Sequence, residues 1–192
     1  RKQRAMVRKG MKAGLAASID TDTADLYRNY SDSVHRLGTP VFSKRYFRKL
    51  CEVFGSDCEI LTVRNGARAV SSVMSFYFRD EVLPYYAGGT AAARELAAND
   101  YMYWEVMRRA CERGVRVFDY GRSKQGTGSF FFKKNWGFEP RPLGYEILLV
   151  HGRRVPEQNP LNPKYRHLIR AWQRMPLALA NAIGPHIVRG LG

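Results

Sequence analysis

The feature that most constrains the fold is a run of sequence in which helical spacing of apolar residues gives way to alternation. Residues 58–63 and 67–78 both have the composition of β-strands, and Asn65-Gly66 lies between them. This dipeptide favours a tight hairpin, because the turn positions need positive φ angles. A third strand-like run follows over residues 81–87. The sequence therefore predicts an antiparallel meander of three strands.

Three helices are predicted before the meander, over residues 1–16, 23–37 and 43–54. Thr23 and Ser43 are suitable N-cap residues, since their side-chain oxygens can accept hydrogen bonds from free backbone N–H groups. The chain begins inside a helical pattern, and a polar break follows it. Residues up to 20 are therefore predicted to form a linker helix from a missing N-terminal half.

A crossover helix is predicted after the meander, starting at Asn99 or Asp100 and closed by Gly114. Asp100 could cap this helix, and glycine is common just past a helix end because it tolerates positive φ. The chain then enters a new strand at residues 115–118, and strand, helix, strand implies a parallel pair. A last strand is predicted over residues 144–150. We therefore expect an α/β domain at residues 21–150, with flanking helices and a mixed antiparallel and parallel central sheet.

The segment after the crossover helix is the best candidate for a substrate site. A short apolar strand ends at Asp119 and Arg122, a turn rich in glycine follows, and Lys133 and Lys134 come next. Loops at strand ends are where α/β proteins usually place their chemistry. The charged side chains indicate a charged substrate.

Composition restricts the partners. The chain has 192 residues, with 32 Lys and Arg against 17 Asp and Glu, and a net charge of +15. This excess favours an anionic partner such as nucleic acid, a membrane surface or a phosphate-rich ligand. The three cysteines show no CxxC spacing and the four histidines are scattered, which predicts no metal site and a cytoplasmic location.

The tail, residues 151–192, consists of a Pro/Asn loop followed by a basic amphipathic helix. Tyr165, Leu168, Ile169 and Trp172 form the apolar stripe of this helix, with basic residues around it. One interpretation is a helix docked on the parent domain or on missing chain. The other is a helix at the surface of an acidic membrane, which would make the protein peripheral on the inner face of that membrane.

Several segments together resemble a known family. They are a basic opening helix (RKQRAMVRKGMKAGL), TPVFSKRYF, YYAGGT, FDYGRS and FKKNWGF, with NPKYR and GPHIVRGLG in the tail. The chain resembles a GCN5-related N-acetyltransferase (GNAT) domain, and within that fold the Fem-type transferases, which add amino acids to peptidoglycan precursors. It is most similar to the FemAB-related proteins associated with PEP-CTERM/exosortase systems. The resemblance implies the acyl-CoA N-acyltransferase fold and a missing N-terminal GNAT-like domain.

The resemblance leaves two donor substrates open. Ordinary GNAT enzymes hold the pyrophosphate of coenzyme A with an Arg/Gln-x-x-Gly-x-Gly/Ala loop after the fourth strand. Residues 87–94, AGGTAAAR, occupy that place and lack the motif, which weakens acetyl-CoA as the donor. Fem-type enzymes are similar in this respect, and the resemblance to them implies aminoacyl-tRNA as donor and a lipid- or nucleotide-linked acceptor. Aminoacyl-tRNA and acyl-CoA both remain as donor substrates, with no further cofactor.

The resemblance also assigns roles to two residues. Lys133 is the lysine of an F-K-x-x-F/W-G pattern, and the matching lysine in Fem-type enzymes is implicated in acceptor binding or oxyanion stabilisation. The alternative is a solvated helix lysine. Asp119 could be a general base for an amine nucleophile, or the structural ion-pair partner of Arg122.

Other residues are predicted to bind substrate. Arg122, beside Ser123, could clamp a phosphate or carboxylate, unless Asp119 or Glu139 neutralises it. Backbone N–H groups around Gly126 and Gly128 could form an anion cradle before a short helix, next to Lys134. Tyr85 and Tyr86 end a strand, so one is expected to face the core and the other the cleft. The remaining aromatic residues of this segment, Trp136 and Phe138, are assigned to the core.

These observations predict a Fem-like acyl or aminoacyl transferase. An amine on a peptidoglycan or exopolysaccharide-linked acceptor of the cell envelope would attack an activated ester or thioester, forming an amide. One alternative is an acetyl-CoA-dependent GNAT N-acetyltransferase. Another is a non-catalytic half of a larger protein that binds tRNA, an anionic membrane or a protein partner.

Overall fold

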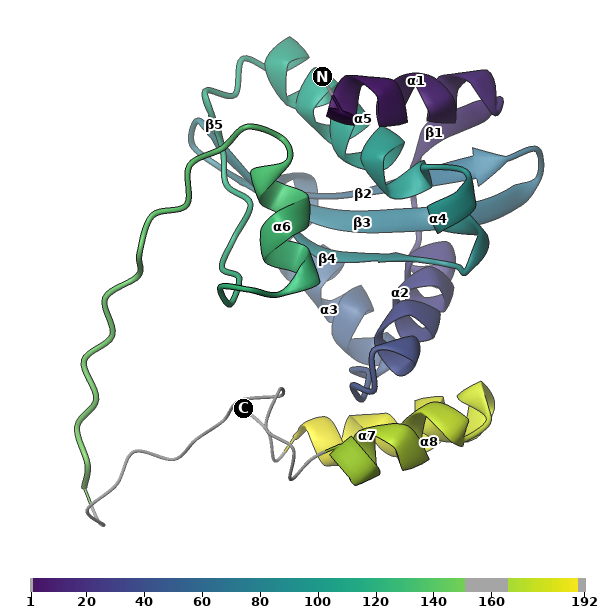
Figure 1. Ribbon diagram of the computed structural model, residues 1–192, viewed down its shortest axis with the longest axis vertical. Helices are drawn as coiled ribbons and strands as arrows, with labels where there is room; N and C mark the ends of the chain where they lie inside the picture. Colours follow the sequence, from purple (N-terminus) through teal and green to yellow (C-terminus); the bar gives the residue numbers. More distant parts are fainter. Residues whose placement is uncertain (1, 151–165, 190–192) are drawn as a thin grey trace.

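The computed structural model describes residues 2–150 and 166–189, and its centre is a five-stranded sheet in the order β1-β2-β3-β4-β5 (Figure 1). Strands β1 to β4 pair antiparallel, and β5 pairs parallel to β4. This confirms the predicted mixed sheet. The strands are β1 Leu15–Asp20, β2 Cys58–Asn65, β3 Arg68–Phe78, β4 Glu81–Gly89 and β5 Val117–Phe118.

Helices cover both faces of the sheet. Figure 1 shows α1 and α5 on one face and α2 and α3 on the other, with α7 and α8 beyond α2. The helices are α1 Lys2–Lys12, α2 Ala24–Arg36, α3 Lys44–Phe54, α4 Ala92–Glu95, α5 Ala98–Glu112, α6 Gly128–Lys134, α7 Arg166–Arg174 and α8 Leu177–Val188, with a 3-10 turn at Gly55–Asp57.

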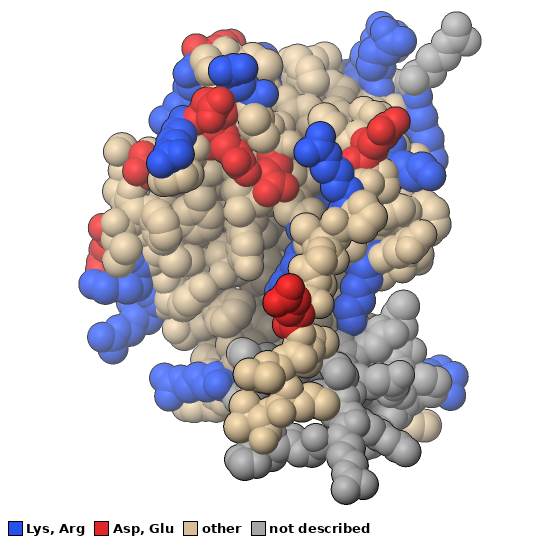
Figure 2. All heavy atoms as spheres, turned by 90° about the vertical axis from the view of Figure 1, so that its left-hand side faces the viewer, with Lys and Arg blue, Asp and Glu red and all other residues tan. Residues whose placement is uncertain are grey.

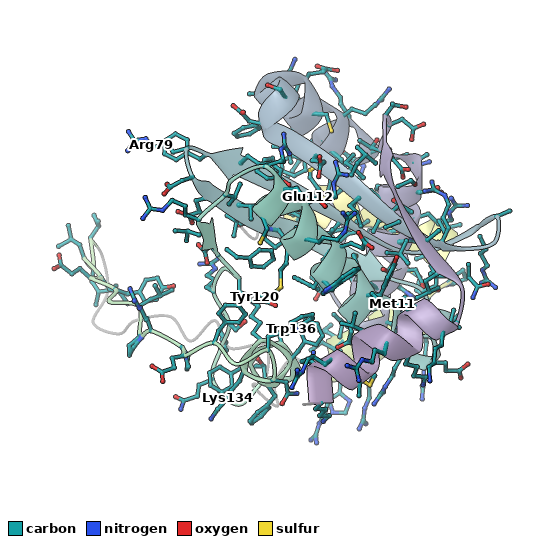
Figure 3. The ribbon with its side chains drawn as sticks, turned by 90° about the horizontal axis from the view of Figure 1, so that it is seen from above. Met11, Arg79, Glu112, Tyr120, Lys134 and Trp136 are labelled. Carbon is teal, nitrogen blue, oxygen red and sulfur yellow. The ribbon has the colours of Figure 1, made fainter. Side chains whose placement is uncertain are left out.

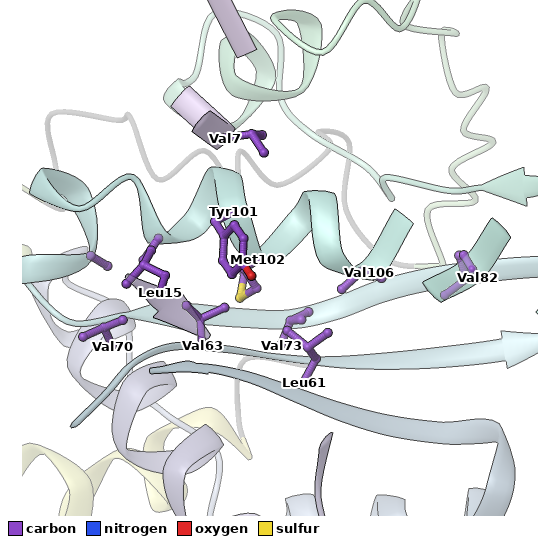
Figure 4. Close-up of a cluster of buried hydrophobic side chains, with 13 residues drawn as sticks. Val7, Leu15, Leu61, Val63, Val70, Val73, Val82, Tyr101, Met102 and Val106 are labelled. Carbon is purple, nitrogen blue, oxygen red and sulfur yellow. The ribbon is translucent and has the colours of Figure 1, made fainter. Parts of the chain in front are cut away.

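The first core lies between the sheet and the α1–α5 layer (Figure 4). Val63 and Val73 point to this face from the central strands, and Met102 and Val106 meet them from α5. Val7 adds the contribution of α1. Because successive strand residues point to opposite faces, the neighbours of these valines are free to build a second core.

That second core is aromatic and lies under α2 and α3. Phe47 is fully buried at its centre, and its ring lies 5.2 Å from that of Tyr86 and 5.4 Å from that of Tyr30. Met74 and Leu26 complete the packing. The edge-to-face ring contacts add to the burial of apolar area.

Several predicted turns and caps are confirmed. Ser43 caps α3 by accepting a hydrogen bond from the N–H of Tyr46 at 3.2 Å, and Gly114 follows α5 with a φ of +74°. The hairpin also forms, but its two loop residues are Gly66 and Ala67, one position later than predicted. Asp100 lies inside α5 instead of capping it, and its carboxylate accepts a hydrogen bond from Gln3.

The predicted linker helix over residues 1–20 is wrong in its second half. Helix α1 ends at Lys12, Gly14 turns the chain with a φ of +71°, and β1 then pairs antiparallel with β2. Leu15 is buried in the first core, so the segment belongs to the same sheet. Small residues after Leu15 gave too little apolar alternation to predict a strand.

The predicted last strand over residues 144–150 is also absent. This segment runs as extended chain outside the sheet, with Leu148 89% and Val150 76% exposed. Its apolar residues have strand propensity, but a strand also needs a neighbour to complete its hydrogen bonds. Strand β5 pairs with β4 through two residues, and the chain then leaves the sheet.

The tail docks on α2. His35 bonds to the backbone oxygen of Trp172 at 2.9 Å, and the side chain of Gln173 donates to the Arg36 carbonyl at 2.8 Å. The docked-helix prediction is thus confirmed for α7, and α8 packs on α2 as well. The predicted Pro/Asn loop and Tyr165 lie outside the described residues.

Candidate active site

The site begins where β5 separates from β4. The ladder joins Glu81 to Val117 and Val82 to Phe118, and the N–H of Asp119 then donates to the Val82 carbonyl at 2.9 Å. Beyond this bond the backbone turns away from the strand. The sheet therefore presents residue 119 and the following loop at its open edge.

A side-chain bond fixes the first turn of this loop. One carboxylate oxygen of Asp119 accepts a hydrogen bond from the N–H of Gly121 at 2.6 Å, and Gly121 has a φ of +62°. A Cβ at Gly121 would lie 3.5 Å from Leu83 of β4, so the turn stays close to the sheet. Asp119 is therefore used structurally through one oxygen, while its side chain is exposed.

Lys133 ties α6 to this loop. Its ammonium donates to the carbonyl oxygens of Gly121 at 3.2 Å and Arg122 at 3.1 Å. Burial lowers the pKa of Lys133, and the negative charge of Asp119 partly opposes that shift. An ammonium carries three N–H donors, so two bonds to the loop leave one for another group. Lys133 is thus held beside the loop instead of extending into solvent.

The charge of Arg122 is not neutralised by either predicted partner. Among the described residues, Arg122 forms no ion pair with Asp119 or Glu139, and its side chain is exposed. Lys134, next to Lys133, is exposed on the outer side of α6 (Figure 3). Two cationic side chains therefore flank the loop without intramolecular compensation.

The glycine-rich turn before α6 contains the N-cap residue of that helix. Thr127 accepts a hydrogen bond from the N–H of Phe130 at 3.3 Å, which starts α6, and Gly126 precedes it with a φ of +81°. A Cβ at Gly128 would meet nothing within 4 Å. The predicted cradle is thus an open turn, in which the cap already occupies one N–H.

Three buried polar atoms near the loop have no hydrogen-bond partner within residues 2–150 and 166–189: the Tyr120 hydroxyl, Ser123 Oγ and Trp136 Nε1. Figure 3 shows Tyr120 and Trp136 on the side where α6 meets α5. The Tyr120 ring stacks on Tyr103 with centroids 5.5 Å apart, and Tyr103 also contacts Phe132 of α6. Unpaired buried polar groups cost free energy, so these atoms mark a place where a ligand could supply bonds.

Tyr85 and Tyr86 differ in burial as predicted, but their rings lie on the same side with centroids 4.7 Å apart, and both are away from Lys133. Tyr86 is 7% exposed, and its hydroxyl lies 2.7 Å from that of Tyr46, whereas Tyr85 is 55% exposed. Burial raises the pKa of Tyr30 to about 12, with the nearby Tyr85 and Tyr46 adding to the shift. This tyrosine group faces α2 and α3, and Lys133 belongs to the opposite face.

A basic cavity lies at the other end of β4. It has a volume of about 370 Å³, and Lys2, Arg36 and Arg94 are among its lining residues. Thr90 Oγ1 and Asn99 Oδ1 also line it, and both are buried without a hydrogen-bond partner. Asp100 also lines the cavity, so three cationic side chains and one carboxylate give it a net positive charge that suits an anion. No local signal in the sequence marks this cavity, because its residues come from α1, α2, α4, α5 and the end of α6.

The loop that borders this cavity does not resemble a pyrophosphate cradle in its bonding. The N–H of Thr90 donates to the Val70 carbonyl at 2.8 Å, and the N–H of Ala93 donates to Thr90 at 3.1 Å. A Cβ at Gly89 would lie 2.8 Å from Ala93, so the turn is filled by the chain itself. Two N–H groups of this turn are therefore committed to bonds within the protein, and the basic side chains of the cavity are the stronger candidates to hold a phosphate.

Surface charge is mixed where the extended chain leaves the domain. On the face seen in Figure 2, acidic side chains are interspersed with Lys and Arg. The positive excess is therefore not gathered into one continuous patch on this face. Within residues 2–150 and 166–189, no group of three His, Cys, Asp or Glu side chains could hold a metal ion, and no helix is long and apolar enough to cross a membrane.

Known structures share this architecture. The crystal structure of FemX has a TM-score of 0.64 at 15% identity, covering 71% of this chain and 53% of that chain. The ribosomal-protein-S18-alanine N-acetyltransferase from Escherichia coli has a TM-score of 0.55 at 11% identity, covering 67% of this chain and 79% of that chain. An aminoglycoside acetyltransferase from an uncultured soil metagenomic sample has 0.54 at 10% identity, covering 70% and 96%.

At these identities the likeness establishes the fold alone, and the chain spans about half the length of FemX. No curated protein matches the sequence. Residues 1–134, however, match the family described as acetyltransferase (GNAT) domain. This match covers more than half of the chain and includes the sheet, the crossover helix and α6. The chain therefore belongs to the acetyltransferase (GNAT) domain family.

Proposed function

We propose that the protein is an acyltransferase that forms an amide on an amine of a cell-envelope acceptor, with the reacting carbonyl beside Lys133. The observation that carries this proposal is the placement of the Lys133 ammonium against two loop carbonyls, with one donor left over. A positioned cation at the end of a strand suits a reaction in which negative charge develops on a carbonyl oxygen.

The reaction breaks one bond and forms another. The amine lone pair attacks the carbonyl carbon of an ester or thioester, and the remaining Lys133 N–H bonds to the resulting oxyanion. The intermediate then collapses to the amide and expels an alcohol or thiol, which takes up the proton that the nitrogen loses. Removing one oxyanion donor in enzymes costs about 10²–10³ in rate, which sets the expected role of Lys133.

The other loop residues have supporting roles in this proposal. The carboxylate oxygen of Asp119 that does not bond to Gly121 would accept the proton of the attacking amine and pass it to the departing alcohol or thiol. Arg122 would hold a phosphate or carboxylate of the acceptor. The buried hydroxyl of Ser123 would form a hydrogen bond with the substrate. Lys134 and the open turn at Gly126 and Gly128 would border the acceptor. Exposed Tyr85 would contact a remote part of it.

The donor would place its phosphate groups in the basic cavity, held by the side chains of Lys2, Arg36 and Arg94. Both an acyl-CoA and an aminoacyl-tRNA carry phosphate and an activated carbonyl, a thioester at the end of the pantetheine arm or an ester on the terminal ribose. The sequence of residues 87–94 lacks the glycine pattern that holds coenzyme A in ordinary GNAT enzymes, and two of its backbone N–H groups, Thr90 and Ala93, are already bonded, which favours the aminoacyl ester over acetyl-CoA. Acetyl-CoA-dependent N-acetylation is the second candidate, supported by the family match.

A further GNAT-like domain, N-terminal to this one, would complete the acceptor site in this proposal. The link to PEP-CTERM systems rests on the tail sequence and is part of the same proposal. A half that only binds tRNA, membrane or partner would show saturable binding but no turnover when both halves are present.

A thermal-shift and turnover assay tests the proposal on Lys133→Ala and on Lys134→Ala, which removes the same charge one position away. Acetyl-CoA, coenzyme A, an aminoacyl-tRNA and a nucleotide-linked sugar-peptide are offered in turn. We expect aminoacyl-tRNA or the sugar-peptide to stabilise the protein, and Lys133→Ala to abolish turnover while Lys134→Ala retains most of it. Stabilisation by coenzyme A compounds alone would select the acetyltransferase. Equal loss in both variants would remove Lys133 from the chemistry.

A further inference from the structure

The tail helices present two different faces to the outside. Helix α8 packs on the domain through Ala180 and Gly184, which are both buried. Beside this buried side, α8 carries Leu179, Ile183 and Ile187, which are 48%, 37% and 39% exposed. These three residues are spaced by four positions, so they form a continuous stripe along one side of the helix. A stripe of large aliphatic residues is thus left without a partner among the described residues.

The neighbouring helix α7 supplies positive charge. It packs on α2 through Ile169 and Trp172, while Arg166, Arg170 and Arg174 recur every fourth position along its exposed side. None of the three arginines forms an ion pair with a described residue. Residues 166–189 contain no Asp or Glu, so nothing within the two helices offsets this charge.

We infer that α7 and α8 together form an attachment surface for an anionic phospholipid membrane. Aliphatic side chains beside arginines, with no acidic residue, match an interface that is apolar below and negatively charged above. Both helices pack on α2 and lie on the same side of the domain, so one flat partner could contact both (Figure 1). No described helix is long enough to span a membrane, so the two helices would lie in its surface.

Two other occupants fit the surface less well. A second copy of this chain would bring the arginines of one molecule against those of the other, with no carboxylate in either helix to pair them. Nucleic acid would satisfy the arginines but would leave the stripe of Leu179, Ile183 and Ile187 in water. A phospholipid surface satisfies both features at once.

The test is co-sedimentation of the full chain with vesicles of phosphatidylglycerol and phosphatidylcholine, compared with phosphatidylcholine alone. We expect binding to the anionic vesicles, weakened by salt because exposed charges are screened. Leu179→Gln with Ile183→Gln should weaken binding by at least about tenfold. Replacing Arg166, Arg170 and Arg174 by Gln should weaken it by about 100-fold, since each basic residue near such a surface contributes about 1 kcal/mol.

A matched control removes two arginines from the exposed side of α3, Arg45→Gln with Arg48→Gln, and should change binding less than about twofold. All the replaced side chains are exposed, so the thermal unfolding of each variant should match the parent. Absence of binding to anionic vesicles would overturn the inference, as would equal binding by the arginine variants of α7 and α3. A dimer in light scattering that the α8 variant dissolves would assign the surface to a second copy instead.

Discussion

The sheet with its covering helices and the loop region that follows differ in how many of their residues are buried. Up to Ala110 the chain contributes nearly all the buried residues of the molecule, in two cores on opposite faces of the sheet. From residue 111 to residue 150 no residue is buried, although this segment carries Lys133 and the loop that it contacts. The first region thus holds the fold, and the second is free to adapt to a substrate at the edge of that fold.

Charges follow the same division. In the first region, Glu59 accepts from Arg109 at 2.9 Å and from Arg113 at 3.2 Å, so its carboxylate is compensated within the protein. In the second region, Arg122 and Lys134 are exposed and have no ion-pair partner among the described residues. Arg122 and Lys134 therefore mark the place beside the loop where an external anion would bind.

The largest effect expected from this contrast is on a matched pair of phenylalanines. Phe47 is fully buried between aromatic rings, so Phe47→Ala should lower the free energy of unfolding by about 3–5 kcal/mol. Phe131 of α6 is 54% exposed, and Phe131→Ala should change that free energy by less than about 1 kcal/mol. Denaturant unfolding of both variants measures the difference. Equal destabilisation would mean that α6 belongs to the same cooperative unit as the sheet.

A pair of glycines should show a smaller difference. A Cβ at Gly88 would lie 2.5 Å from the backbone Cα of Tyr30, so Gly88→Ala should force α2 away from β4 and cost about 1–3 kcal/mol. Gly128 in the first turn of α6 has open space around it. Gly128→Ala should change stability by less than about 0.5 kcal/mol, because an exposed alanine fits a helix well. Thermal unfolding of the two variants checks the prediction, and a larger loss at Gly128 would contradict it.

Two helix caps with the same geometry sharpen the comparison further. Ser43 and Thr127 each accept a hydrogen bond from the N–H three residues later, at 3.2 Å and 3.3 Å. Ser43→Ala should lower global stability by about 1 kcal/mol, because α3 covers the second core. Thr127→Ala should leave global unfolding nearly unchanged and instead accelerate hydrogen exchange within α6. If Thr127→Ala lowers global stability as much as Ser43→Ala does, the two regions are not energetically separate.

What sequence could predict depended on whether the signal was local. The Asn65-Gly66 hairpin, the Ser43 cap and the glycine after α5 each act through a few neighbouring residues, and each is present. The parallel pairing of β5 was also predictable, because a helix between two strands restricts their direction. Strand β1 was missed since Leu15 has only small or polar neighbours, and its place depends on pairing with β2.

The sequence predicted the cationic side chains of the site but not the contacts that surround them. The pattern around Lys133 located the lysine, yet its bonds to the carbonyls of Gly121 and Arg122 follow from how α6 folds back on the loop. Tyr120 and Trp136 look like ordinary core aromatics in the sequence. Only their packing shows that a hydroxyl and an indole N–H are buried without partners.

The smallest expected effect is a change in pH dependence at Lys133, where the two regions meet. Burial lowers the pKa of this lysine, so its ammonium is lost at a lower pH than the usual value of about 10.4. If the ammonium stabilises the oxyanion, kcat/KM should fall as pH rises through the lowered pKa. The unfolded chain binds this proton more tightly than the folded chain, so stability should rise slightly with pH between the two pKa values.

Lys133→Arg separates this explanation from others, because a guanidinium stays charged throughout the alkaline range. We expect the variant to be slower at neutral pH, since the planar group cannot reproduce the bonds to both carbonyls, and to lose the alkaline fall in kcat/KM. Lys134→Arg is the control and should keep the fall unchanged. The measurement is the pH profile of amide formation with the uncatalysed rate subtracted. A fall that persists in Lys133→Arg belongs to another group, and the ammonium beside the loop would then serve only to hold α6 against the sheet edge.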